Sequence, residues 1–251
     1  MPHLAPAVST ALEHLQFPNE SPAYRRARNA LLAEEMELRR QIERVAAQRR
    51  ALPPGGKIPE DYVFDGIGMA GRPEPLRLSQ LFAPNHDTLL IYSFMFGPER
   101  DAPCPGCTHF LDALDGAVKH IEQSASLAIV AKSPLSRLLE WQRQRGWRFL
   151  RLLSTDGNTY DRDYFGDSTA LAAAMREQQD FKPGEEWDMP ILNVFRREGG
   201  GTIRHFWGSE LLYVPPEPGQ EYRHNDLLDP LWNALDVTPA GRGDFHPKLR
   251  Y

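Results

Sequence analysis

The chain has only two cysteines among 251 residues, and it lacks both a long apolar run and an excess of positive charge. No stretch approaches the roughly 18 apolar residues of a membrane helix, and residues 1–17 show no basic start followed by an apolar core. We therefore predict neither a membrane span nor a secretory signal. A net charge of −5 gives no reason to expect nucleic acid or an anionic membrane as a partner. These absences are typical of a cytoplasmic protein, in whose reducing surroundings a disulfide is more often transient than structural.

The two cysteines form the motif Cys104-Pro105-Gly106-Cys107. An apolar run ends shortly before the motif at Phe96, and an amphipathic helical pattern begins at the motif itself. A C-x-x-C pair between a strand and a helix predicts a redox-active dithiol. A structural zinc site normally needs four Cys or His ligands, and the chain has no second pair. We predict no metal and no cofactor, and keep an inert remnant of a redox site as an alternative.

The two thiols are expected to differ in environment. Pro105 suits the first helical position, which places Cys104 at the cap and Cys107 inside the first turn, on the same stripe as Phe110 and Leu114. The helix start offers unpaired N–H groups and positive dipole charge to a Cys104 thiolate. We therefore predict that Cys104 attacks and that Cys107 resolves the mixed disulfide.

Two charged neighbours are candidates for supporting roles. Arg100 precedes the motif, where its charge would stabilise a thiolate, although acidic residues flank it on both sides. His109 is the nearest imidazole and is a candidate for proton exchange, against the alternative of an exposed helix residue with no role. His205 and Trp207 reach the motif only if the order of the strands brings them there.

The central sequence alternates strands and helices, which favours a sheet with parallel strands and helices on both faces. Strands are predicted at 88–96, 127–131 and 149–153, with helices from the C-x-x-C motif to about 123 and from 133 to 146. A short edge strand is predicted at 62–66. A polar, aromatic-rich insertion at about 156–188, with a short helix at 168–178, precedes a hairpin at 191–195 and 202–207. One long helix is predicted from Ser21 to Ala51, and a last helix near 226–235.

Several segments resemble an uncharacterised, mainly bacterial thioredoxin-like family of predicted dithiol–disulfide oxidoreductases. The matching segments are Glu60-Asp61-Tyr62-Val63-Phe64-Asp65-Gly66, Tyr92-Ser93-Phe94-Met95-Phe96-Gly97, Cys104-Pro105-Gly106-Cys107 and Leu235-Asp236-Val237-Thr238-Pro239. The resemblance covers roughly residues 20–240 and implies an α/β, thioredoxin-like fold with a central mixed sheet. We expect an N-terminal arm and long helix over 1–56, a thioredoxin-like domain over 57–236 and a C-terminal tail over 237–251.

The resemblance also implies a role for Met189-Pro190. In thioredoxin-like folds a cis-proline begins the strand that faces the active-site helix, and the backbone before it pairs with the substrate. Met189 and Pro190 stand directly before an apolar strand, the matching place in the order of elements. Any X–Pro bond is more often trans than cis, so both forms are open.

A wider likeness extends to peroxiredoxins, but their peroxide-binding pattern is absent. Peroxiredoxins place Pro seven residues and Thr or Ser three residues before the reactive cysteine. Counted back from Cys104, these positions hold Gly97 and Asp101. The apolar run before the motif also holds no acidic residue of the kind that relays protons in classical thioredoxins.

The sequence thus predicts a thiol–disulfide oxidoreductase acting on a protein or small-molecule disulfide or thiol, through Cys104 and Cys107. Thiol-dependent peroxide reduction is one alternative. A non-catalytic protein that binds a metal or a partner is another. A homodimer formed through the long helix is open as well, because Tyr24, Leu31 and Leu38 recur every seven residues.

Overall fold

The computed structural model describes residues 16–171, 187–221, 223 and 225–250. The chain divides into two compact units, Met1–Pro53 and Pro54–Tyr251. In the first unit, helix α2 (Pro22–Arg50) begins where Ser21 Oγ accepts the Tyr24 N–H at 3.1 Å, and it ends before the proline pair that starts at Pro53. The long helix expected at 21–51 is therefore confirmed. Within the described ranges, no helix is long and apolar enough to cross a membrane.

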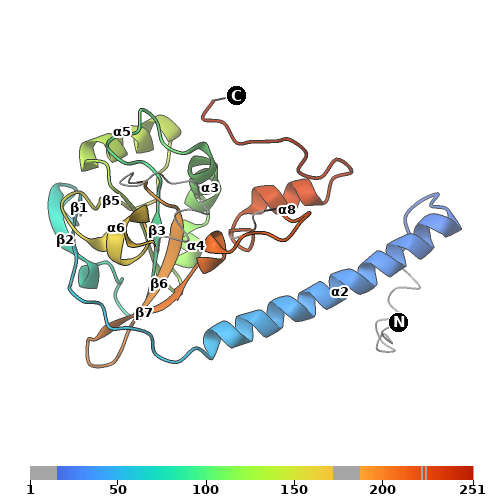
Figure 1. Ribbon diagram of the computed structural model, residues 1–251, viewed down its shortest axis with the longest axis horizontal. Coiled ribbons are helices and arrows are strands. Elements are labelled where there is room, and N and C mark those ends of the chain that lie inside the picture. Colours follow the sequence, from blue (N-terminus) through green and yellow to red (C-terminus); the bar gives the residue numbers. More distant parts are fainter. Residues whose placement is uncertain (1–15, 172–186, 222, 224, 251) are drawn as a thin grey trace. The chain divides into compact units, whose positions relative to one another are not determined.

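The second unit is built around a single sheet (Figure 1). Its strands are β1 (Val63–Ile67), β2 (Pro73–Arg77), β3 (Thr88–Ser93), β4 (Ser126–Ala131), β5 (Leu152–Ser154), β6 (Ile191–Arg197) and β7 (Ile203–Gly208). Its α-helices are α3 (Pro105–Asp115), α4 (Val118–Ile121), α5 (Leu135–Arg145), α6 (Tyr160–Asp163) and α8 (Pro230–Asp236). Short 3₁₀ turns are η1 (Leu78–Gln80), η2 (Ser168–Ala170) and η3 (Glu210–Tyr213).

The sheet runs in the order β2-β1-β5-β4-β3-β6-β7. Strands β3, β4 and β5 are parallel, with α3 and α5 in the two crossovers, while β6 lies antiparallel to β3 and β7 antiparallel to β6. Order and direction of β4-β3-β6-β7, with the C-x-x-C helix directly after β3, define a thioredoxin-like fold. The predicted fold class is confirmed, and the motif stands at the carboxyl end of a central strand.

Both faces of the sheet are buried, which explains why its central strands are nearly continuous apolar runs. Along β3, Leu90 and Tyr92 face one core with α3 and α5, whereas Leu89 and Ile91 face the other. The first core is aromatic around the motif, with Phe94 against Trp147 at a ring-centroid distance of 6.0 Å. The cysteines therefore stand above a packed layer that fixes the start of α3.

The structure corrects three details of the predicted elements. Strand β1 is not an edge strand, because β2 pairs with it and forms the edge of the sheet. Strand β2 begins at Pro73 and contains a second proline, which an edge strand tolerates. The helix after the motif ends at Asp115, and α4 follows as a separate turn, because Gly116 caps α3. The final helix begins at Pro230, later than the predicted 226. The helix expected at 168–178 lies mostly outside the described residues, which show η2 there.

Candidate redox site

The backbone of Cys104 is held on both sides by hydrogen bonds. Its N–H donates to Met95 O at 2.9 Å, which ties the motif to the loop leaving β3. Its carbonyl accepts two bonds from Thr108, one from the N–H and one from Oγ1, each 2.9 Å long. Pro105 occupies the first helical position and Cys104 the N-cap, as the sequence predicts. The cap residue of α3 is thus a thiol in a fixed position rather than a hydroxyl or carboxylate.

The two thiols have different surroundings. Cys107 is only 3% exposed and packs within the first core, which includes Phe110 and Tyr92, while Cys104 is half-buried. The Tyr92 hydroxyl hydrogen-bonds the Cys107 sulfur. Neither cysteine is in a disulfide. One thiol is open to a reactant, and the other is close behind it in the protein interior.

The same surroundings shift the two thiol pKa values in opposite directions. The pKa of Cys104 is lowered to about 6, chiefly by a hydrogen bond from the Cys107 side chain; burial opposes this shift, and the N–H groups of Cys107 and Gly106 support it. The Arg100 charge adds a smaller contribution. Burial, followed by the hydrogen bond and negative charge of Cys104, raises the pKa of Cys107. At neutral pH the arrangement holds one thiolate on Cys104 and one proton on Cys107.

The loop that carries Arg100 is fixed by two residues that sequence reasoning missed. Arg100 Nε lies 2.6 Å from Asp188 Oδ1, and Asp188 Oδ2 accepts the Gly97 N–H at 2.7 Å. Arg137, on α5, donates to the carbonyls of Gly97, at 3.1 Å, and Arg100. The only local signal in the sequence was the acidic residue directly before Met189-Pro190; nothing near Arg137 indicated its role.

Met189 and Pro190 lie beside the motif at the start of β6. The Met189–Pro190 peptide bond is trans. Pro190 lines the same cavity as Cys104 and Cys107, whereas Met189 is buried. The Met189 N–H donates to Gly166 O at 2.8 Å and Pro190 has no N–H, so neither residue offers a free backbone donor to a bound chain.

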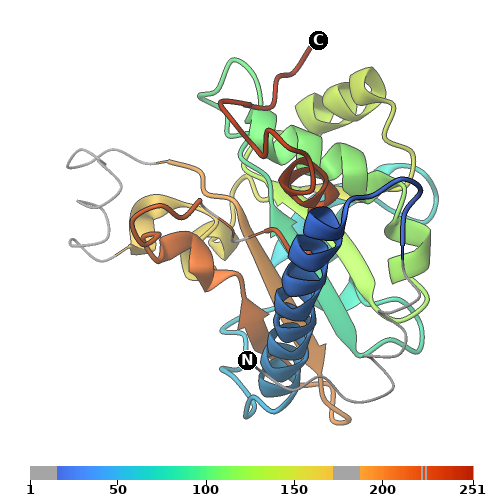
Figure 2. The same ribbon diagram turned by 90° about the vertical axis from the view of Figure 1, so that its right-hand side faces the viewer.

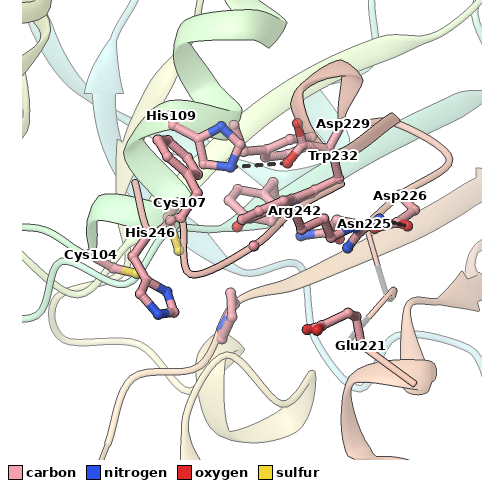
Figure 3. A pocket seen from close by; sticks show the side chains of 16 residues that line it. Cys104, Cys107, His109, Glu221, Asn225, Asp226, Asp229, Trp232, Arg242 and His246 are labelled. Atoms are coloured by element: carbon pink, nitrogen blue, oxygen red, sulfur yellow. Dashed lines mark hydrogen bonds and ion pairs between the residues drawn. The ribbon is translucent and has the colours of Figure 1, made fainter. Parts of the chain in front are cut away.

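A cavity of about 310 Å³ opens over the cysteines, and the C-terminal segment forms its opposite wall (Figure 3). On the sheet side it is lined by Cys104, Cys107 and Pro190. On the other side it is lined by residues after β7, of which Trp232, Phe245 and His246 are examples. Figures 1 and 2 show this segment, in red, running beside α3. The sequence predicted only a final helix and an irregular tail here, because no local pattern indicates contacts with α3, which lies about 120 residues earlier in the chain.

His109 connects α3 to this C-terminal segment. Its Nε2 lies 3.1 Å from Asp229 Oδ2, and its ring meets Trp232 edge to face at 5.8 Å between centroids (Figure 3). Asp229 is 2% exposed, and its other carboxylate oxygen caps α8 by accepting the Leu231 N–H at 3.0 Å. The expectation that His109 is an exposed helix residue is therefore wrong, while its role in proton exchange stays a prediction. The Asp229-Pro230 pair is a local signal for a helix start. No local signal in the sequence indicated that Asp229 contacts His109.

His205 and Trp207 lie on β7 and do not line this cavity. His205 Nε2 lies 2.9 Å from Asn193 Oδ1, and its ring stacks on Tyr164. Burial lowers the pKa of His205, which favours the neutral ring. Over the part of the chain that the structure describes, no group of three or more His, Cys, Asp and Glu side chains is arranged to hold a metal ion.

Several solved structures are similar to this one at low identity. A peroxidoxin, BcpB, from Mycobacterium tuberculosis is 14% identical with a TM-score of 0.43, covering 70% of this chain and 94% of that one. A peroxiredoxin Q variant from Xanthomonas campestris is 14% identical with a TM-score of 0.39, over 69% and 90%. The exposed lipoprotein thioredoxin Etrx1 from Streptococcus pneumoniae is 14% identical with a TM-score of 0.33, over 67% and 98%. No curated protein matches the sequence.

One family model matches nearly the whole chain. It spans residues 15–250, and therefore includes the long helix, the cysteine motif and the C-terminal segment that closes the cavity. The chain belongs to the family described as "Bacterial protein of unknown function (DUF899)".

Proposed function

We propose that this protein is a thiol–disulfide oxidoreductase in which Cys104 is the nucleophile and Cys107 the resolving thiol. The observation that carries the proposal is the paired geometry of the two thiols. Cys104 is half-buried at the start of α3 with its pKa lowered to about 6, and Cys107 is buried behind it with its pKa raised. A thiolate is the attacking species in disulfide exchange, and about nine-tenths of Cys104 is in that form at pH 7 with such a pKa.

The exchange runs in two steps. The Cys104 sulfur bonds one sulfur of a disulfide R–S–S–R while the S–S bond breaks, and the leaving R–S⁻ takes up a proton. Cys107 then gives up its proton, bonds the Cys104 sulfur and releases the second thiolate, which is protonated in turn. The substrate gains two electrons and becomes two thiols, and the protein dithiol becomes a disulfide. A thiol or dithiol reductant returns the protein to its starting state.

The surrounding residues support these steps. The N–H groups of Gly106 and Cys107 and the charge of Arg100 stabilise the Cys104 thiolate. When Cys104 enters the mixed disulfide it loses its negative charge. The charge and hydrogen bond of Cys104 then no longer raise the pKa of Cys107, while the Tyr92 hydroxyl still lowers it. Cys107 is thus activated only after the first step.

Trapping of the mixed disulfide tests these assignments. The reduced Cys107→Ser protein, mixed with bis(2-hydroxyethyl) disulfide and examined by intact mass after acid quench, is expected to retain one mercaptoethanol adduct on Cys104. The matched Cys104→Ser protein is expected to form an adduct at least about a hundredfold more slowly, because its remaining thiol is buried and protonated. Equal adduct rates in the two variants would contradict the assignment of nucleophile and resolving thiol.

A further inference from the structure

The C-terminal segment 225–246, together with Glu221, restricts access to the cysteines. Asp229, Trp232 and Phe245 line the same cavity as Cys104 and Pro190, so a polypeptide that reaches the cysteines has to share a volume of about 310 Å³ with these side chains. The backbone offers such a chain no free N–H at this point, because the Met189 N–H is already bonded to Gly166 O and Pro190 has none. Both features oppose a protein substrate.

Three contacts tie this part of the chain to the domain, one within the segment and one on either side of it. Before the segment, the Tyr213 hydroxyl donates to Phe165 O at 2.9 Å. Within it, Asp229 contacts His109 on α3. After it, Arg145 Nη1 on α5 donates to Leu249 O at 2.8 Å. The wall of the cavity is therefore tied to the domain before, beside and beyond the cysteines.

Arg242 stiffens the segment internally. It forms ion pairs with Asp226, at 2.6 Å, and with Asp236, at 2.9 Å, and its guanidinium lies over the Trp232 ring at 5.1 Å. The Arg242 side chain is only 8% exposed. This ion-pair network keeps α8 and the following loop in one arrangement around Trp232.

The cavity fits a small ligand that combines apolar surface with positive charge. Its volume of about 310 Å³ lies at the lower end of the roughly 300–1,000 Å³ typical of ligand pockets. Tyr92, Phe110 and Trp232 provide apolar walls. Its lining has three carboxylates; Asp226 and Asp229 are engaged by arginines and by His109.

The third carboxylate, Glu221, points toward the open cavity (Figure 3) and has no hydrogen-bond or ion-pair partner among the described residues. Among the lining residues that the structure describes, the one arginine, Arg242, is neutralised by Asp226 and Asp236. The Glu221 carboxylate therefore leaves an unpaired negative charge in the lining, on the side away from the cysteines (Figure 3).

Building on the proposed exchange chemistry, we propose that the substrate is a small-molecule disulfide bearing an amino group. Its S–S bond meets Cys104, its carbon chains lie against the aromatic walls, and its ammonium group meets Glu221. Trp232 and Glu221 are then the residues that determine specificity. The reaction is the two-step reduction given above, and the small disulfide is converted to two thiols, of which at least one carries the amino group.

Three small disulfides of similar size and different charge test this proposal: cystamine, bis(2-hydroxyethyl) disulfide and 3,3′-dithiodipropionate. Each is mixed with the reduced full-length protein, and the rate of Cys104–Cys107 disulfide formation is measured by acid quench, alkylation and intact mass. Each rate is divided by the rate of the same reagent with dithiothreitol, which removes intrinsic reactivity. Insulin is the protein substrate in a fourth arm.

We expect the normalised rates to fall from cystamine to the neutral disulfide to the dicarboxylate, with insulin at least tenfold below cystamine. Glu221→Gln should lower the ratio of the cystamine rate to the neutral rate about two- to fivefold, the range of an exposed ion pair. Glu217→Gln, an exposed change outside the cavity, should leave that ratio unaltered. Trp232→Ala should raise the insulin rate relative to that of the neutral disulfide.

Two results would overturn the inference while leaving the exchange function intact: a dicarboxylate rate equal to the cystamine rate, or an insulin rate that matches it. If Glu221→Gln leaves the ratio of the cystamine rate to the neutral-disulfide rate unchanged, the assignment of Glu221 as the ammonium-binding residue is wrong. If none of the four reagents produces a Cys104–Cys107 disulfide, the proposed function itself fails. The two kinds of failure are therefore distinguishable in one experiment.

Discussion

Removal of the Cys107 thiol should raise the pKa of Cys104, because the hydrogen bond from Cys107 is the largest cause of its low value. A hydrogen bond to a charged group contributes about 1.5–3 kcal/mol, which corresponds to about 1–2 pKa units. We therefore expect Cys107→Ala to move the pKa of Cys104 from about 6 to about 7–8. The matched variant Cys107→Ser keeps a hydroxyl donor in nearly the same place, so its shift should be clearly smaller.

The pH dependence of iodoacetamide alkylation measures this pKa, since only the thiolate reacts. The rate of adduct formation on Cys104 is followed by intact mass between pH 4.5 and 9.5 in the wild-type protein and in both variants. A midpoint in Cys107→Ala that agrees with the wild-type midpoint would refute the hydrogen-bond argument. A shift as large in Cys107→Ser as in Cys107→Ala would assign the effect to packing instead.

Three other changes have expected outcomes that depend on single contacts. Arg100→Gln should raise the alkylation midpoint of Cys104 by less than Cys107→Ala does, because the Arg100 charge is the smallest of the named causes; a larger rise would reverse that order. Gly166→Ala should destabilise the protein by about 1–3 kcal/mol in urea unfolding, because an added Cβ would lie 2.8 Å from Ser93 Oγ and closer still to Asp161 Oδ1. Gly199→Ala, with nothing within 4 Å, is its control, and equal losses would contradict the crowding argument. Burial raises the pKa of Asp161 from 3.8 to about 6, so the stability linked to its neutral form is present below pH 3.8 and lost as the pH rises through 6. Relative to Asp161→Asn, the wild-type protein should therefore lose about 2.4 kcal/mol of unfolding free energy between pH 4 and pH 7, and parallel curves would contradict this.

The elements around the motif could be predicted because their signals are local. Each of these signals reflects a backbone preference that depends on only a few residues. They are the apolar runs of β3 and β4, Pro105 at a helix start and Gly146 at a helix end. Gly146 adopts φ +74°, the left-handed conformation in which glycine has no Cβ penalty. The split between an outer and a buried thiol followed from helical periodicity in the same way.

The rest of the candidate site depends on contacts between distant segments. Asp188 meets Arg100 from 88 positions away, and Asp229 meets His109 from 120 positions away. In the sequence Asp188 and Asp229 are two of 34 acidic residues, and no local pattern distinguishes them from the others. The β2 edge strand was missed for a different reason, since its prolines and charges argue against a strand anywhere except at an edge.

A redox titration tests the central claim, the function of Cys104 and Cys107 as a dithiol couple, most directly. The protein is equilibrated in glutathione buffers of defined potential, quenched with acid, alkylated and examined by intact mass. Reversible formation of a single intramolecular disulfide, with a midpoint between about −120 and −270 mV, is the predicted result. Two free thiols at every potential would contradict it.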